Sequence, residues 1–211
     1  MDKNEFTRKC SEFNTYGDCY YAVWDNFLPL QEFGLLKDYM TTGMGWNVSQ
    51  KINAYDTSNE DFYLAKLIFN VQDYATDQWR KDVDINPFIN LTSKIHINAL
   101  MRIKANLYVR TGAHNIHAPH IDYEMFHQGA LFYVTACDAP TYMADGTEIE
   151  AIENRLLIFN AATPHSSSSP TNVPFRITIN INYFGAGPRL EYINDRAYSR
   201  PTLISENFPK G

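Results

Sequence analysis

Two long stretches of strict alternation between apolar and polar residues stand out in the second half of the chain. From Ala99 to Arg110, apolar residues take every second position, and polar residues such as Tyr108 take the positions between them. The same period of two returns between Arg176 and Tyr183. Because successive side chains of a β-strand point to opposite faces, each stretch predicts a strand with one face on a core and one polar face.

Six shorter apolar runs lie between these two strands, and turn residues such as Asp145-Gly146 separate them. The runs predict six short strands: 118–123, 129–136, 141–144, 147–152, 155–160 and 164–168. Together with the two long strands they make eight strands with no helix between them. Such a series is typical of a double-sheet jelly roll rather than of a parallel βαβ fold.

The first half of the chain follows a helical period instead. A strand at 20–27 is expected to lead into a helix after Pro29, and apolar residues at helical spacing predict a second helix over Glu60–Arg80. Asn86-Pro87 predicts the start of a shorter third helix. Residues 1–20 are polar and mixed, and we expect an arm or an edge strand there.

These patterns predict an α+β fold that is mainly β, namely a double-stranded β-helix (jelly roll) with N-terminal helices packed on one sheet. We expect a single domain over 1–211, because 211 residues suffice for one substantial core. Its parts would be a helical lead-in at about 20–97, a barrel at about 98–184 and an irregular tail at 185–211. The tail is expected to wrap the barrel or to meet a partner.

Composition and charge narrow the class of protein. Apolar residues make up 45% of the chain and charged residues 20%, which indicates a globular protein. The net charge of −6 argues against nonspecific nucleic-acid binding, which depends on many cationic contacts. The 3 cysteines lack metal-type spacing, and no secretory signal or apolar run of about 18 residues is seen. We therefore expect a cytoplasmic protein without a membrane partner; the oligomeric state is not predicted.

One group of residues carries candidate chemistry. His120 and Asp122 are two positions apart in a predicted strand, so they can point at one spot. With His165 as the third ligand they make two histidines and one carboxylate, the arrangement expected of non-haem Fe(II) oxygenases. Arg176 begins the polar face of the last long strand, and its planar guanidinium suits the grip of a carboxylate. Thr178 shares that face and can add a hydroxyl donor.

In this combination the chain resembles the 2-oxoglutarate/Fe(II)-dependent oxygenases, and the prolyl-4-hydroxylase-like branch most of all. That family has His-x-Asp, a distal His some tens of residues later, and an Arg or Lys roughly ten residues after it, often followed by x-Ser or x-Thr. Here the intervals are 45 residues from His120 to His165 and 11 from His165 to Arg176. The strings VWDNFLPLQEF, LLIFNAATPHSS and FRITININYF are also similar to family segments, so the resemblance spans roughly residues 20–184.

The resemblance implies a dioxygenase that couples oxidative decarboxylation of 2-oxoglutarate to hydroxylation of a substrate C–H bond, with succinate and CO2 as co-products. It implies these Fe(II) ligands: His120, Asp122 and His165. It implies these residues for 2-oxoglutarate: Arg176, Thr178 and Tyr108. Asn106 shares the polar face of Tyr108 and is a candidate for the inner carboxylate of the co-substrate. O2 would be the second co-substrate, and ascorbate is left open as a further cofactor.

Other polar residues receive no role at the metal. Three histidines stay outside the ligand set: His114, His117 and His127. The first two precede His120 at steps of three residues, which do not converge on one point in an extended loop. A cationic stripe on the first long strand is interpreted as a solvated face, with contact to an anionic substrate as the minor interpretation: Arg102, Lys104 and Arg110.

Two alternative functions stay open. The first is a nucleic-acid oxidative demethylase of the same superfamily, because Asn106-Leu107-Tyr108 resembles the Asn-x-Tyr of that branch. The acidic net charge and Asn182, which stands where that branch has a second Arg, make this partner the less expected one. The second is a non-catalytic, cupin-like barrel that binds a metal or small ligand. The primary substrate also stays open among peptidyl proline, a free amino acid and another small metabolite.

Overall fold

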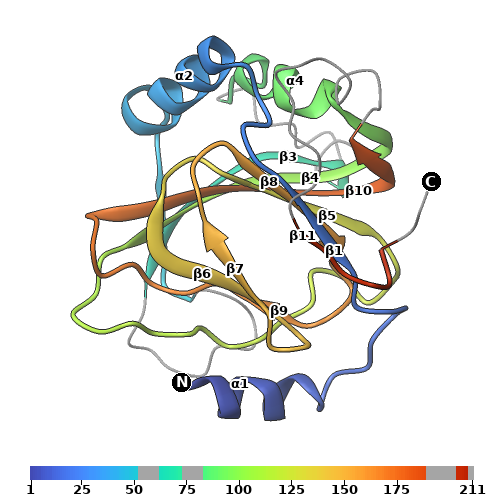
Figure 1. Ribbon diagram of the computed structural model, residues 1–211. Helices are drawn as coiled ribbons and strands as arrows, with labels where there is room; N and C mark the ends of the chain where they lie inside the picture. Colours follow the sequence, from blue (N-terminus) through green and yellow to red (C-terminus); the bar gives the residue numbers. More distant parts are fainter. Residues whose placement is uncertain (52–61, 73–82, 189–202, 209–211) are drawn as a thin grey trace.

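The structure is a computed structural model, and it describes residues 1–51, 62–72, 83–188 and 203–208. Two antiparallel sheets face each other, and helices cover the outer side of the larger one (Figure 1). This is the mainly β jelly roll that the sequence predicts. Within the described ranges, no helix is long and apolar enough to cross a lipid bilayer.

The larger sheet runs through most of the chain. Its strands stand in the order β11-β1-β8-β5-β10-β4-β3-β2, and each neighbouring pair is antiparallel. Their bounds in chain order are β1 Tyr21–Trp24, β2 Asn47–Ser49, β3 Tyr63–Asn70, β4 Ile95–Val109, β5 Gln128–Tyr133, β8 Arg155–Asn160, β10 Phe175–Pro188 and β11 Leu203–Ile204. The two long strands that the alternation predicts, β4 and β10, are direct neighbours near its centre.

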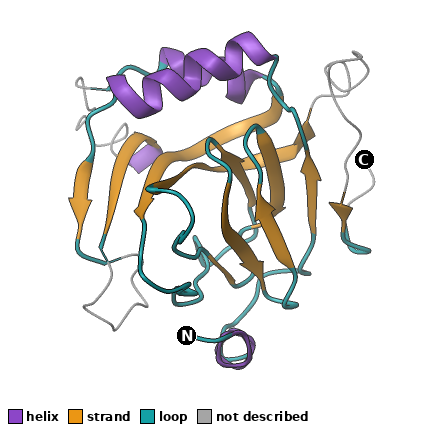
Figure 2. Ribbon diagram, turned by 60° about the vertical axis from the view of Figure 1, so that its left-hand side comes forward, coloured by secondary structure: helices purple, strands orange, loops and turns teal. Residues whose placement is uncertain are grey.

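The smaller sheet has the order β7-β6-β9. Its strands are β6 Cys137–Met143, β7 Glu148–Ala151 and β9 His165–Ser166. It lies opposite the larger sheet, so the two sheets enclose a space between them (Figure 1, Figure 2).

Helices α2 Leu30–Asp38 and α4 Asn86–Ser93, with a π-helical turn at Tyr39–Gly43, pack on the larger sheet (Figure 2). Phe33 and Phe88 belong to the same buried cluster as Ile103 of β4 and Ile179 of β10. The apolar faces of the two long strands therefore turn toward the helices. Since the faces alternate, the polar faces of both strands turn toward the smaller sheet.

The predicted helix over Glu60–Arg80 is wrong for residues 63–70, which form strand β3. A register shift between Leu67 and Phe69 breaks the period of two in this strand. The shift gives its apolar residues a spacing that resembles a helical stripe, and short apolar runs cannot be assigned by periodicity alone. Residues 71 and 72 are helical, and the remainder of the prediction, residues 73–80, lies outside the described residues.

We predicted an arm or an edge strand over residues 1–20, but part of this segment is helical. Lys3–Cys10 form helix α1, and the carboxylate of Asp2 caps it by accepting a hydrogen bond from the Glu5 backbone N–H at 2.9 Å. Phe6 is fully buried on the inner side of this helix. The Asp2-x-x-Glu5 spacing is a helix-start signal that the prediction overlooked.

The predicted strand 118–123 is also wrong. In this segment the structure has one isolated bridge, between His120 and His165, while Ile116 pairs with Ser168 earlier in the loop. Pro119 has no backbone N–H to donate to a ladder, which disfavours a continuous strand there. Strand 155–160 matches the prediction residue for residue, whereas 164–168 is reduced to the two residues of β9.

The tail from residue 185 is less irregular than predicted, because β10 continues to Pro188. Further on, β11 pairs with β1, where Ile204 faces Ala22. The ring of Phe208 then packs against those of Tyr20 and Trp24. The described part of the tail thus adds to the edge of the larger sheet.

Asn154 joins the start of β8 to the segment before α2. Its backbone has a φ of 59°, and its buried side chain both accepts from the Leu28 N–H and donates to the Leu28 carbonyl, each at 2.8 Å. Asparagine tolerates this left-handed conformation better than most residues do. The side chain therefore serves the turn and the neighbouring segment together.

We expect Asn154→Ala to lower the free energy of unfolding by about 2–4 kcal/mol, because it strains the turn and leaves two buried backbone groups unpaired. Urea denaturation measures the change. Asn26 is the matched control, since it also has a positive φ, 52°, but its side chain is exposed. Asn26→Ala should cost about 1–2 kcal/mol, the conformational part alone. Equal losses in the two variants would contradict the role given to the hydrogen bonds.

Candidate metal and co-substrate site

A cavity of about 240 Å³ lies between the two sheets. The polar faces of β4 and β10 form one wall, which is why charged and polar residues line it. The pairing register sets these residues opposite one another in rows, with Tyr108 facing Arg176 and Asn106 facing Thr178. These four residues, for which we expect co-substrate roles from the sequence, all line the cavity.

The structure brings His120, Asp122 and His165 together on the opposite wall. Their ligand atoms all lie within 4.8 Å of one another. Two backbone hydrogen bonds of 3.0 Å, one in each direction, join His120 to His165, and the Asp122 N–H donates to the Ala161 carbonyl at 3.0 Å. The backbone of two segments that are 45 residues apart thereby fixes the cluster.

The tautomer of His165 is set by its surroundings. Its Nδ1 lies 3.0 Å from the Thr163 carbonyl oxygen, which can only accept, so Nδ1 carries the proton. This leaves the lone pair of Nε2 free on the side of Asp122, whose Oδ2 is 3.9 Å away. The ring of Phe159 packs edge-on against the imidazole and limits its rotation. Such support is what a metal-binding histidine requires.

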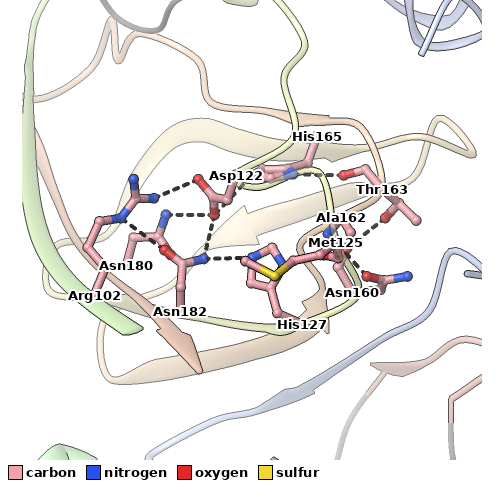
Figure 3. Close-up of polar contacts among 10 residues, drawn as sticks. All are labelled: Arg102, Asp122, Met125, His127, Asn160, Ala162, Thr163, His165, Asn180 and Asn182. Atoms are coloured by element: carbon pink, nitrogen blue, oxygen red, sulfur yellow. Dashed lines mark hydrogen bonds and ion pairs between the residues drawn. The ribbon is translucent and has the colours of Figure 1, made fainter. Parts of the chain in front are cut away.

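A cage of donors surrounds the carboxylate of Asp122 (Figure 3). Arg102 donates to Oδ1 at 2.8 Å, and the amides of Asn182 and Asn180 donate to Oδ2 at 2.8 and 3.1 Å. The Oδ1 of Asn182 accepts from Arg102, while its Nδ2 also contacts Nε2 of His127 at 3.2 Å. Since an ionised carboxylate has about four lone-pair positions, three donors leave one for a cation.

Electrostatics keep His120 and Asp122 unprotonated. Burial raises the pKa of Asp122, but the charge of Arg102 and the hydrogen bond from Asn182 outweigh it, so the pKa lies below its usual range. Burial, together with the neighbouring His165, lowers the pKa of His120 to about 3. A metal ion binds neutral imidazole and ionised carboxylate, so these two ligands need to release no proton at neutral pH.

Arg176 is fully buried at the other end of the cavity. Its guanidinium donates to the Ser168 carbonyl at 3.2 Å and to the Thr141 hydroxyl at 2.8 Å, and the rings of Tyr108 and Tyr133 lie 5.5 and 5.6 Å from it. Its Nε has no hydrogen-bond partner, and no carboxylate of the described residues pairs with the side chain. A buried cation without a counter-ion is costly, so this end of the cavity suits an anionic ligand.

Thr141 adds a donor that the sequence did not reveal. Its Oγ1 accepts hydrogen bonds from both the Tyr133 hydroxyl, at 2.7 Å, and Arg176. A hydroxyl has two acceptor positions and one proton, so the proton of Thr141 is left for a further acceptor. Thr141 lines the cavity, which makes a carboxylate bound at Arg176 a suitable acceptor.

The cationic stripe of β4 is not the solvated face that we predicted. Arg102 holds Asp122, and Lys104 lines the cavity; of the three residues, Arg110 alone is exposed. The prediction failed because it assigned Arg102 and Lys104, on the polar face of β4, to the outer surface of the protein. The unbroken alternation was the signal that Arg102 and Lys104 point the same way as Tyr108.

The three histidines that we left out of the predicted ligand set lie outside the cluster. The ring nitrogens of His117 contact the hydroxyls of Ser167 and Ser169, both at 2.8 Å, and its ring stacks on Tyr108. His127 supports Asn182, as described above, and Nε2 of His114 lies 3.3 Å from the Tyr142 hydroxyl. These contacts give each of the three a partner other than a metal.

Comparison with known proteins agrees with the architecture. No family model matches the sequence, and no curated protein matches it. A prolyl hydroxylase from Trichoplax adhaerens, solved in complex with a hypoxia inducible factor oxygen degradation domain peptide fragment, is similar with a TM-score of 0.50. The identity is 15%, and the match covers 87% of this chain and 90% of that one. A Pseudomonas putida prolyl-4-hydroxylase gives a TM-score of 0.47 at 15% identity, over 85% and 98%.

At such identities the likeness concerns the fold. The chain therefore has the double-stranded β-helix fold of the 2-oxoglutarate/Fe(II) oxygenases, in the form found in prolyl hydroxylases.

The burial of His117 predicts an acid-sensitive fold. Burial and the charge of Arg176 lower the pKa of His117 to about 3, from an ordinary value of about 6.5. Between these values the unfolded chain binds the proton and the folded chain does not, so stability falls as the pH falls. For one such group the loss between pH 7 and pH 5 is about 2 kcal/mol. We expect His117→Gln to reduce the pH dependence of metal-free protein by that amount, measured by urea unfolding at both pH values. An unchanged dependence would contradict this.

The cage around Asp122 predicts an effect on metal affinity. We expect Asn182→Ala to raise the dissociation constant for Co(II) or Mn(II) about 10–100-fold, because it frees the carboxylate and its partner Arg102. Calorimetric titration of the metal measures it. Asn172→Ala is the control, since Asn172 accepts from the Asp138 N–H in an exposed turn. Equal affinities in both variants would show that the amide does not position the ligand.

Proposed function

We propose that this protein is an Fe(II)-dependent dioxygenase that couples the oxidative decarboxylation of 2-oxoglutarate to hydroxylation of a primary substrate. One observation carries the proposal. The cluster of His120, Asp122 and His165 shares a cavity with Arg176, a buried cation that no carboxylate of the described residues neutralises. Two histidines and a carboxylate leave coordination positions open, and an unpaired guanidinium suits the far end of a dicarboxylate.

The residues of the metal site would hold Fe(II) through the two imidazoles and one carboxylate oxygen. When bound, Fe(II) supplies the activation of dioxygen. Thr163 holds His165 in the tautomer that presents Nε2, and Arg102 with Asn182 fixes the direction of Asp122. These contacts preorganise the site, so the ligands need not reorient when the ion enters.

The residues near Arg176 would hold 2-oxoglutarate. Arg176 would pair with the far carboxylate, and the hydroxyls of Thr141 and Thr178 would donate to the same group. Tyr108 lies beside the guanidinium, with its ring stacked between those of Tyr63 and His117. The stack limits the movement of the Tyr108 ring beside the guanidinium.

The hydroxylation site would be on a peptidyl or free amino acid such as proline, as the family resemblance suggests. The peptide fragment is bound in the structure of the Trichoplax protein. That this chain also acts on a peptide is part of the proposal. A non-catalytic barrel, in contrast, would bind Fe(II) and 2-oxoglutarate but release no succinate. An anaerobic titration with both, followed by exposure to oxygen, separates binding from turnover.

We expect Asp122→Ala to abolish Fe(II)-dependent release of succinate from 2-oxoglutarate, because the metal would lose its anionic ligand. We expect Arg176→Ala to raise the apparent KM for 2-oxoglutarate by about 30-fold or more, since it removes the partner of a buried carboxylate. Arg110→Ala is the matched control: Arg110 is exposed just beyond the end of β4, and this variant should keep the wild-type KM. Undiminished turnover in Asp122→Ala would refute the metal assignment.

A further inference from the structure

The charges that line the cavity are not balanced. Among the residues that the structure describes, Arg102, Lys104 and Arg176 contribute three cations to its wall, and Asp122 contributes one carboxylate. Fe(II) would add two positive charges and 2-oxoglutarate two negative ones. The excess of positive charge on the cavity wall is therefore the same with both bound. Arg102 is paired with Asp122, and Arg176 would receive the co-substrate. Lys104 is the cation that neither role explains.

The contacts of Lys104 are with an uncharged residue. Its Nζ donates to the Tyr63 hydroxyl at 2.6 Å and lies 5.1 Å from the centre of the same ring. No carboxylate of the described residues forms an ion pair with it. Burial lowers the pKa of Lys104, and an anion placed beside it would favour the charged form again.

The position of Lys104 separates it from the proposed co-substrate carboxylate. Lys104 faces Asn180 in the register of β4 and β10, whereas Arg176 faces Tyr108. Along the backbone, four residues of a strand, about 13 Å, separate Lys104 from Tyr108, although the Tyr63 ring that Lys104 contacts stacks on Tyr108. The two cations also have different polar partners, because Lys104 donates to Tyr63 of β3 and Arg176 donates to Thr141 of β6. We therefore assign the two cations to different ligands.

The size of the cavity limits what this second ligand can be. Its volume of about 240 Å³ is below the range of about 300–1,000 Å³ that is usual for sites of drug-sized ligands. Because the same space would also hold 2-oxoglutarate, the part of the second ligand that enters it must be small.

We propose that Lys104 binds a carboxylate of the primary substrate, so that the enzyme hydroxylates a small carboxylic acid, such as a free or N-acylated amino acid. The inference rests on the proposed function and names the substrate class of the same site. It predicts that loss of the substrate carboxylate and loss of the Lys104 charge have the same effect on binding.

The test uses pairs of probes that differ only in the carboxylate. The full chain is loaded with Mn(II) and saturating 2-oxoglutarate under argon and titrated calorimetrically with N-acetyl amino acids and their primary amides. We expect at least one acid to bind about tenfold or more tightly than its amide. Lys104→Met should remove this preference, and Lys104→Arg should retain most of it. Lys9→Met, which removes a charge from helix α1 far from the cavity, is the matched control and should behave as wild type.

Three results would overturn the inference: no acid of the panel binds, acids and amides bind alike, or Lys104→Met weakens 2-oxoglutarate instead of the acids. A second titration, on metal-free Arg176→Met protein, separates this inference from the proposed function. A preference for acids that depends on Lys104 there supports the anion site even if no succinate is ever released. If succinate is released but acids bind no more tightly than amides, the proposed dioxygenase function is supported and the role of Lys104 is refuted.

Discussion

The antiparallel pairing of β4 with β10 is the constraint on which the rest of the structure depends. It sets residues of the two strands opposite each other from Phe175 and Val109 inward, in an unbroken register as far as Asn182 and Arg102. Because each strand alternates, one choice of register decides both the packing of the helices and the lining of the cavity. A slip of one residue would carry Arg176 into the apolar layer beneath α2 and α4.

The pairing also explains how distant parts of the chain meet at one carboxylate. Arg102 and Asn182 face each other in the ladder, so both approach Asp122 from the same row. On the other side, the bridge between His120 and His165 joins the loop before β5 to the short strand β9. The candidate metal site thus lies where the long ladder and the bridge face each other across the cavity. Its geometry follows from backbone pairing on both walls.

Much of this arrangement could be predicted from sequence, for a physical reason. The period of two in β4 and β10 is strong because one face of each strand is buried under helices, and the His-x-Asp, distal His and Arg spacing could be recognised because few folds require it. Strand β3 could not be assigned, since its bulge at Leu67 and Phe69 hides the period. The partners of Asp122 were also missed. Arg102 has the same pattern as a solvated strand residue, and only the position of the opposite wall shows that it is enclosed.

The donors around Asp122 have a consequence for the choice of ion. With Oδ1 engaged by Arg102 and Oδ2 by two amides, the carboxylate has room to offer a cation a single oxygen. Calcium commonly takes carboxylates in the bidentate manner and fills a shell of six to eight oxygens. A residue held in this way, beside two imidazoles, would disfavour calcium and favour a smaller first-row transition ion, so the hydrogen bonds of one aspartate would contribute to the choice of metal.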